Sequence, residues 1–570
     1  MGEEPAAGGH LGTGNIYGRK QPQWDWKAGW WLCQDAPDCG KEGVRAGVPC
    51  GHLVDFFFLK RWLKRIGLCA GGLVLLLLVF ALEEHVRGRR ALNKHLSRLR
   101  ANGEVYSVAA LEPKHPPADQ NAFVDLTNLA DRLKPIVKHL DDAPPQFRFA
   151  APGKEIVAWR LNQWGKGGNL TNDWSRLGPE LEEARPLLDL LHAAVQRPAY
   201  DSGFDYSRGN SDIQLIHVHE AQLVKLKCIA PLLQSATLYD LHQGNLTAAG
   251  GDLCAMVKFA ADLKPEPLVT AQRYRGSFAT KAFDTTWQAL QAPGWNDAQL
   301  ATLQAAWEGC DFIKDMESAL EMERALDFDF YERIKISMAK LGSTMAEREA
   351  FYDKSRSLGS LPAHGFALRW LYVPLWRLAW ADQQELFDLN EWKFVIEHER
   401  LANTNSLSAL PRLSDTGDEI GPLIFWGDQM NWYDRLRLPF AQEGFTMSDR
   451  SISKVLCVQM QQEMAVTAIA LHRYGLRTGM LPTDLSALVP KYLPALPRDY
   501  INGKTLLYRL QPDGNFVLYS ATVGSKDNGG YITLLTDQRD SNQIWDGRDA
   551  VWPAPATDEE ATAAMKSARN

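Results

Sequence analysis

The hydrophobic and polar positions of the chain change pattern several times, and the sharpest change comes first. Residues 66–82 read IGLCAGGLVLLLLVFAL, without a charged side chain. At about 1.5 Å per residue this run forms a helix about 25 Å long, which is at the short end of membrane-spanning lengths. The pattern predicts a transmembrane helix over residues 54–82; a buried core helix is the alternative. The helix has a basic lead-in of Lys60, Arg61, Lys64 and Arg65, whose long side chains can reach lipid headgroups.

The charges beside this run indicate its orientation. The basic lead-in favours a cytoplasmic N-terminus, because loops on that side carry the excess of Lys and Arg. Arg87, Arg89 and Arg90 follow on the other side and weaken the asymmetry. The run lies far from Met1 and is followed by no cleavage motif, so we do not expect a cleaved signal peptide.

The segments on either side of the span carry weaker patterns. Residues 1–53 are rich in Gly, Pro and Trp without periodicity, which predicts a disordered tail. The spacing of Cys33, Cys39, Cys50 and His52 fits no standard zinc site. Residues 83–120 are predicted to form a helical stalk and a linker. Apolar residues at near-helical spacing mark the stalk, and Pro113, Pro116 and Pro117 mark the linker.

Residues 121–445 have mainly helical periodicity and are predicted to form a helical domain. Six apolar residues share one helix face: Ala184, Leu187, Leu188, Leu191, Ala194 and Val195. A helix capped by Ser211-Asp212 is expected to run to His242 and to stop at Gly244-Asn245. With a second helix over residues 247–263, it would form a helical hairpin.

The segment from Phe366 to Trp380 reads FALRWLYVPLWRLAW and is intensely aromatic. Its arginines argue against a second membrane span. One interpretation is a core helix that Pro374 kinks. The other is a strip that faces a lipid interface or a ligand, because Trp and Arg suit headgroups and sugars.

Residues 446–555 change character and predict a small α+β module, followed by a tail over residues 556–570. A helix capped by Ser448-Asp449 is expected to end at Gly475 or Gly479, before a short helix that contains Leu485 and Leu488. Two β-rich runs follow, residues 505–510 and 515–521, joined by Pro512-Asp513-Gly514, a hairpin turn signal. Residues 531–535 are expected to add a third strand.

This C-terminal text resembles the globular part of type II secretion major pseudopilins. The matching pieces are Leu481-Pro482, Leu488-Val489-Pro490, Leu496-Pro497, Asp499, Tyr519-Ser520 and Asp527. The text also resembles a group of uncharacterised single-pass bacterial envelope proteins, in which it closes a longer helical region. The prepilin leader is missing near Ile66 and residues 103–445 have no pseudopilin counterpart, so we do not expect a pilus subunit.

The resemblance implies a calcium site in the final loop, since that family binds the ion there. Asp527 falls in the matching loop, and Asp549 is a weaker match ahead of Trp552. Calcium takes six to eight oxygen ligands, and exposed loop aspartates are usually only solvated. We expect no other cofactor.

Composition and motifs exclude several classes of function. A formal net charge of -7 argues against nucleic acid as a partner. His219-Glu220 begins like a zincin helix, but Leu223 stands where the second His belongs. Asp327 and Asp329 are expected on a solvated or salt-bridged helix face, although either can pair with a distant acid.

The sequence therefore predicts a mainly α protein with one transmembrane helix, a large helical body and a small pseudopilin-like module. We expect it in the bacterial inner membrane, with the N-terminus cytoplasmic and the bulk of the chain periplasmic. The expected partners are membrane lipid, through residues 66–82, and an envelope protein. The expected function is binding or scaffolding without catalysis. The alternative is an envelope hydrolase that acts on glycans or peptides through the Trp-rich helical domain.

Overall fold

The computed structural model describes eleven stretches of the chain. They are residues 52–137, 149–151, 153–160, 163–164, 172–208, 213–343, 368–404, 431–440, 445–520, 529–530 and 550–567. Within them the protein is mainly helical, which confirms the predicted class. The main helices are α1 (His52–Ala101), α2 (Val108–Leu111), α3 (Phe123–Leu133), α4 (Trp174–Val195), α5 (Ile213–Leu226), α6 (Ile229–His242), α7 (Leu246–Asp262), α8 (Val269–Ala289), α9 (Asp297–Glu308), α10 (Phe312–Ile336), α12 (Val373–Ala379), α13 (Ala381–Thr404), α15 (Trp432–Arg437), α16 (Phe445–Thr478) and α17 (Asp558–Ser567).

The remaining elements are short. A π-helical turn, η4 (Leu368–Tyr372), precedes α12, and 3₁₀ turns lie at η2 (Ala158–Arg160) and η8 (Leu485–Leu488). The strands are β1 (Phe149–Ala151), β2 (Lys154–Glu155), β3 (Gln163–Trp164), β4 (Asn172–Asp173), β5 (Leu507–Leu510), β6 (Phe516–Ser520), β7 (Ala550–Trp552) and β8 (Ala554–Pro555).

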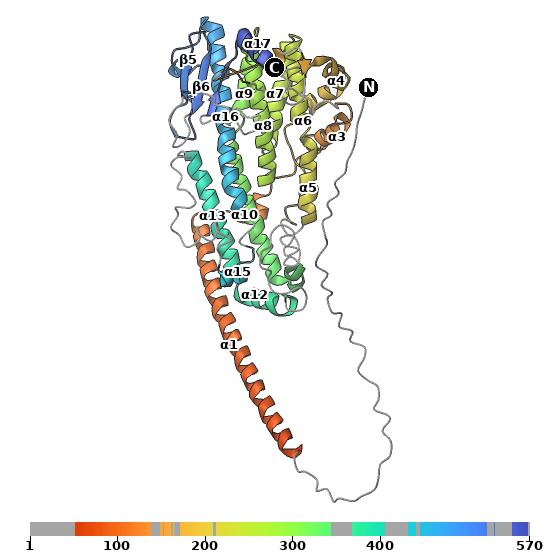
Figure 1. Ribbon diagram of the computed structural model, residues 1–570, viewed down its shortest axis with the longest axis vertical. Coiled ribbons are helices and arrows are strands. Elements are labelled where there is room, and N and C mark those ends of the chain that lie inside the picture. Colours follow the sequence, from red (N-terminus) through yellow and green to blue (C-terminus); the bar gives the residue numbers. More distant parts are fainter. Residues whose placement is uncertain are drawn as a thin grey trace, which may run out of the picture. The chain divides into compact units, whose positions relative to one another are not determined.

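The long helix α16 lies within the helical body (Figure 1). It packs against α8, α9 and α10, while α6 packs against α7 and α10 against α13. Residues 74–570 form one compact unit, and residues 1–73 form another. The predicted boundary between residues 445 and 446 thus falls inside the larger unit, at the start of α16.

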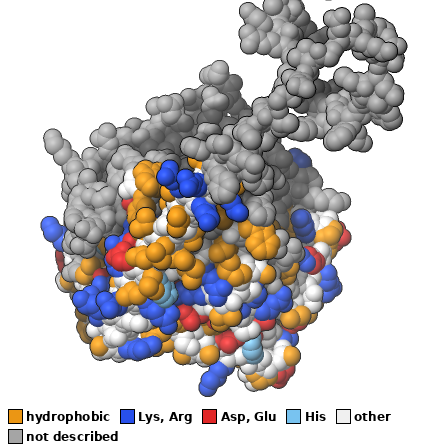
Figure 2. All heavy atoms as spheres, turned by 90° about the horizontal axis from the view of Figure 1, so that it is seen from below, with side chains coloured by type: hydrophobic (Ala, Val, Ile, Leu, Met, Phe, Trp, Pro, Cys, Tyr) orange, Lys and Arg blue, Asp and Glu red, His pale blue; other side chains and the backbone are white. Residues whose placement is uncertain are grey.

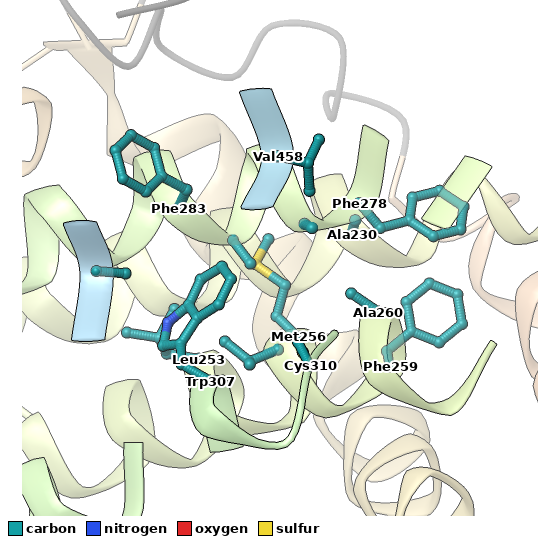
Figure 3. Close-up of a cluster of buried hydrophobic side chains, with 14 of the residues drawn as sticks. Ala230, Leu253, Met256, Phe259, Ala260, Phe278, Phe283, Trp307, Cys310 and Val458 are labelled. Carbon is teal, nitrogen blue, oxygen red and sulfur yellow. The ribbon is translucent and has the colours of Figure 1, made fainter. Parts of the chain in front are cut away.

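The main core is built from apolar side chains of α6, α7, α8, α9 and α16. Figure 3 shows Met256 of α7 among them, with Trp307 of α9 and Val458 of α16 nearby. Met256 and Trp307 are fully buried, and burying side chains of this size contributes about 1.5–3 kcal/mol each. The apolar periodicity of five helices therefore converges on one core.

Helix ends follow the local signals in the sequence. Gly244 has a φ of 74°, a left-handed conformation that favours glycine, and it separates α6 from α7. Asn245 then caps α7 by accepting a hydrogen bond of 3.3 Å from the Ala248 amide. The helix expected between residues 211 and 242 is two helices, α5 and α6, with Cys228 at the start of α6.

The C-terminal sheet has the strand order β5-β6-β7 and is antiparallel. The predicted hairpin is confirmed, since Leu507 pairs with Tyr519 and Gly514 has a φ of 84° in the turn. The third described strand is β7, whereas the strand expected over residues 531–535 lies outside the described residues. The Trp287 indole of α8 donates to the Pro553 carbonyl at 2.9 Å, so the end of β7 is fastened to the helical core. The pseudopilin-like character of this region stays a prediction.

Candidate functional site: the junction between α1 and the helical body

The apolar run predicted to span a membrane lies in the first part of α1. Among the described residues, α1 is the one helix long and apolar enough to do so, through one 18-residue window. Only 6% of that window is buried, so the alternative of a buried core helix is wrong. From Leu73 to Val79 every side chain is exposed, and such a surface is unfavourable in water but favourable in lipid.

The apolar run meets the helical body at its last residues. The rings of Phe80 and Trp380 pack edge to face, with centroids 6.2 Å apart. Ala81 is buried in a separate hydrophobic cluster with Val373 and Trp376 of α12 and with Phe440. The side chains of α1 therefore change within one turn from exposed to packed against the helical body.

The first polar contact of this junction is formed by Glu84, and we call it the proximal contact. The Gln383 side-chain amide of α13 donates to the Glu84 carbonyl at 3.0 Å and to its carboxylate at 2.7 Å. Arg87 donates to the same carboxylate. Burial raises the pKa of Glu84, but these hydrogen bonds more than reverse that effect, so the pKa lies below its ordinary value.

Gly88 lies close against Gln383 of α13. A Cβ atom at this position would lie 2.7 Å from Gln383 Cγ and 3.4 Å from the Gln383 backbone nitrogen. Real contacts are never that short, so any larger residue would push the helices apart. The glycine is thus part of the packing between α1 and the body.

The second polar contact lies just after α1 ends, and we call it the distal contact. The Glu104 carboxylate is bound by Arg400 at 2.5 Å and by Arg324 at 2.9 Å. Arg324 is 1% exposed and also donates to the Val105 carbonyl at 2.8 Å. Glu317 and Glu321 of α10 each lie 2.6 Å from the Arg400 guanidinium. Burial raises the pKa of Glu104, and the two arginines lower it below its ordinary value.

A third group of charges joins α10 to α13 beside the proximal contact. Lys335 Nζ lies 2.7 Å from Asp382 and is also bonded to Glu385. Burial raises the pKa of Glu385 to about 7, although Lys335 opposes the shift. His85 of α1 lies 3.9 Å from the other oxygen of Asp382, so this group also reaches α1.

Asp327 and Asp329 have separate surroundings. Asp329 forms an ion pair with Arg333 on its own helix, as expected for a salt-bridged face. Asp327 accepts a hydrogen bond of 2.5 Å from the Trp392 indole of α13. It also belongs to an acidic group with Asp388 and Glu391. Burial raises the pKa of Glu391 well above its ordinary value, and the charges of Asp388 and Asp327 raise it further.

These acids make hydrogen bonds that join α13 to α10. Glu391 is 7% exposed and Asp388 accepts hydrogen bonds from Tyr331 and Gln384. Within the described parts of the chain, no group of three or more His, Cys, Asp or Glu side chains is placed to hold a metal ion.

The structure does not test the ligand-binding residues predicted from the sequence. Asp527 and Asp549, the expected calcium ligands, lie outside the described residues, as do Cys33, Cys39 and Cys50. His219 is buried, and its partner across space is Glu266, with His219 Nε2 4.0 Å from the Glu266 carboxylate. Burial lowers the pKa of His219 to about 4.

The junction itself was not predicted from the sequence. Asp382, Glu385, Asp388 and Glu391 recur every three residues on α13, a pattern that ordinarily indicates a solvated helix face. Two of them, Asp382 and Glu385, are buried beside Lys335 of α10, which the local sequence does not indicate. Comparison with known proteins adds nothing to this geometry, because no protein family, curated protein or solved structure matches the chain.

Proposed function

We propose that this chain is a single-pass membrane protein whose helical body is held firmly at one end of its anchor and binds an envelope protein partner. The observation that carries the proposal is the continuity of α1. Its residues 74–79 expose apolar side chains, while its residues 84, 92, 95 and 99 are buried in the body. A flexible stalk would not have these buried positions.

The proposed location of the protein in the cell is supported by the sequence. The basic residues before the span favour a cytoplasmic N-terminus, and the C-terminal resemblance favours the bacterial inner membrane with a periplasmic body. A reporter fused after Asn570 that is active only outside the cytoplasm is the expected result. Activity only in the cytoplasm would overturn the orientation.

Membrane anchorage is tested by extracting cell membranes with alkaline carbonate. The full chain should stay in the membrane fraction. The double variant Leu76→Arg/Leu78→Arg should be released, since each arginine near the centre of a span costs about 3 kcal/mol. The matched control is Leu190→Arg, on an exposed position of α4, which should be retained like the wild type. Release of the wild-type chain by carbonate would contradict the proposal.

Partner binding is assigned to the C-terminal sheet. Within the described residues β5 pairs with β6 alone, and Leu507 and Leu510 on β5 are exposed. Edge strands of this kind accept a further strand through their backbone groups. The pseudopilin-like text of this region supports an envelope partner of the secretion type. The alternative of an envelope hydrolase stays a prediction from the sequence.

The test is an in-cell crosslink of the tagged full chain, followed by identification of the proteins recovered with it. Leu507→Arg/Leu510→Arg should lose the recovered envelope protein, whereas Leu476→Arg, on an exposed position of α16, should keep it. Recovery of the same protein with both variants would remove β5 from the proposal.

A further inference from the structure

The segment formed by η4 and α12 carries exposed as well as buried apolar side chains. Val373, Trp376 and Ala379 are buried in the cluster that contains Ala81 of α1. Leu371 of η4 and Leu378 of α12 are 66% and 55% exposed. A helix on the surface of a water-soluble body ordinarily carries polar residues on its outer face. The outer face of this segment is therefore matched to a medium other than water.

The start of α15 exposes a further apolar side chain. Trp432 is 74% exposed, and its ring lies against Tyr433, with centroids 6.0 Å apart. Tyr433 in turn contacts Trp380 at 5.9 Å between centroids. We call Leu371, Leu378 and Trp432 the apolar surface of the body.

One part of this surface, Trp432, is linked to the end of the membrane span through aromatic contacts. Trp380 is the residue that packs against Phe80 in the apolar run of α1, and Tyr433 packs against the same Trp380. Figure 1 shows α12 and α15 at the same end of the helical body. If the apolar run lies in lipid, the apolar surface is carried to the edge of the same hydrocarbon layer.

The charges nearby fit a lipid headgroup layer. Arg89 and Arg90 are exposed on α1 and follow Leu82, the last residue of the apolar run. At about 1.5 Å per residue they lie about 10–12 Å further along the helix, within reach of headgroup phosphates for an arginine side chain. Figure 2 shows hydrophobic side chains gathered at this end, with Lys and Arg side chains beside them.

We propose that the apolar surface formed by Leu371, Leu378 and Trp432 inserts into the interface of the lipid bilayer that α1 spans. Tryptophan is enriched at this depth because its ring is apolar and its N–H is polar. The body would then rest on the membrane through a second site, which fixes its tilt as well as its distance. The inference depends on the proposed membrane anchor, and the experiment below separates the two.

The experiment uses the full chain in lipid nanodiscs that contain anionic and zwitterionic phospholipids. Two lipid probes carry a photoreactive diazirine, one close to the headgroup and one at the end of the acyl chain. After irradiation, the labelled peptides are identified by mass spectrometry. We expect the shallow probe to label residues 368–380 and 431–437, and the deep probe to label residues 66–82.

Two failures are distinguishable in this experiment. If the deep probe labels residues 66–82 but neither probe labels residues 368–380 or 431–437, the inference is overturned and the anchor stands. If residues 66–82 remain unlabelled, the anchor fails and the inference fails with it. Leu371→Glu/Leu378→Glu should lose the label on residues 368–380, while Leu190→Glu should keep it.

Another occupant of the surface would be revealed by a photoreactive side chain. With benzoylphenylalanine in place of Trp432, irradiation of the nanodisc sample should give lipid adducts. A crosslink to a second copy of the chain, without lipid adducts, would assign the surface to self-association and contradict the inference.

Discussion

The two halves of α1 expose opposite kinds of side chain. The leucines of the first half, such as Leu75 and Leu76, are exposed, whereas Leu92 and Leu99 in the second half are buried. The polar Glu84 and His95 of the second half are buried as well. A single continuous helix thus serves two surroundings, with the change between Phe80 and Glu84.

This difference indicates that residues 83–101, which follow the span, do more than connect the span to the helical body. Residues 83–101 were expected to form a stalk, and they are helical as predicted. Their buried side chains and the two polar contacts fix the body to the anchor. Substitutions in and around α1 test this contrast between the two halves, and the largest expected change in stability comes first.

Loss of the distal contact should have the largest effect. Glu104→Ala leaves the buried Arg324 without its carboxylate, and removal of one partner of a buried ion pair costs about 3–5 kcal/mol. Thermal unfolding of the full chain in detergent, followed by circular dichroism, measures the loss. Glu183→Ala, an exposed acid on α4, is the control and should change stability by less than about 0.5 kcal/mol. Equal melting temperatures for the two variants would refute the role of Glu104.

Glu399 of α13 should make stability depend on pH. It is fully buried, neither carboxylate oxygen has a hydrogen-bond partner in the described residues, and burial raises its pKa to about 8. A carboxyl whose pKa is raised in the folded state stabilises the fold while it is protonated. That stability is lost as pH rises from the unfolded pKa near 4.5 through about 8.

Glu399→Gln removes this titration. The variant should be more stable than the wild type by roughly 2–4 kcal/mol at pH 8, with little difference at pH 5. Glu397→Gln, at an exposed position two residues away, should show no such pH dependence. Denaturant unfolding at the two pH values measures both, and a gain for Glu399→Gln that is the same at pH 5 and pH 8 would count against a buried, protonated Glu399.

One substitution should have different effects in the two halves of α1. Gly88→Ala introduces a Cβ against Gln383. It should lower the free energy of unfolding by about 1–3 kcal/mol, because no space for a further carbon atom remains between Gly88 and Gln383. Gly72→Ala adds a Cβ that meets nothing within 4 Å and should be neutral or slightly stabilising. Thermal unfolding in detergent compares the two, and equal costs would show that the second half of α1 is not packed as described.

The smallest expected effect is a difference in stability between variants of two neighbouring acids, Asp327 and Asp329. Asp327→Asn should cost about 1–2 kcal/mol because the Trp392 indole loses a charged acceptor. Asp329→Asn removes an ion pair within one helix and should cost no more than about 0.5 kcal/mol. Unfolding experiments near pH 7 test the order, and the reverse order would place Asp329 rather than Asp327 at the helix interface.

Local patterns predicted much of the fold. Three predictions that depend on residues close in sequence are confirmed. They are the long apolar helix, the helix boundary at Gly244-Asn245 and the hairpin at Gly514. The placement of α16 against α8 and α9 was not predicted, because the core that joins them combines apolar faces from distant parts of the chain. Helix periodicity shows that a face is buried but not against which helix.

The contacts of the junction could not be predicted from the sequence, because they too join distant parts of the chain. Glu104 and Arg400 are 296 positions apart, and nothing in the local sequence of either one indicates the other. The aromatic strip was predicted with two alternatives, a core helix and an interfacial strip. Trp376 is buried, as a core helix requires, whereas Leu378 is exposed, and the interfacial strip stays a prediction.

The measurement that tests the central claim most directly is hydrogen–deuterium exchange of the full chain in lipid nanodiscs. We predict that the backbone amides of residues 83–101 exchange as slowly as those of α10 and α13, because these elements are fastened together. Glu104→Ala should speed the exchange of residues 83–101. Fast exchange of residues 83–101 in the wild type, with slow exchange in α10 and α13, would contradict the account and show that a flexible stalk joins the anchor to the body.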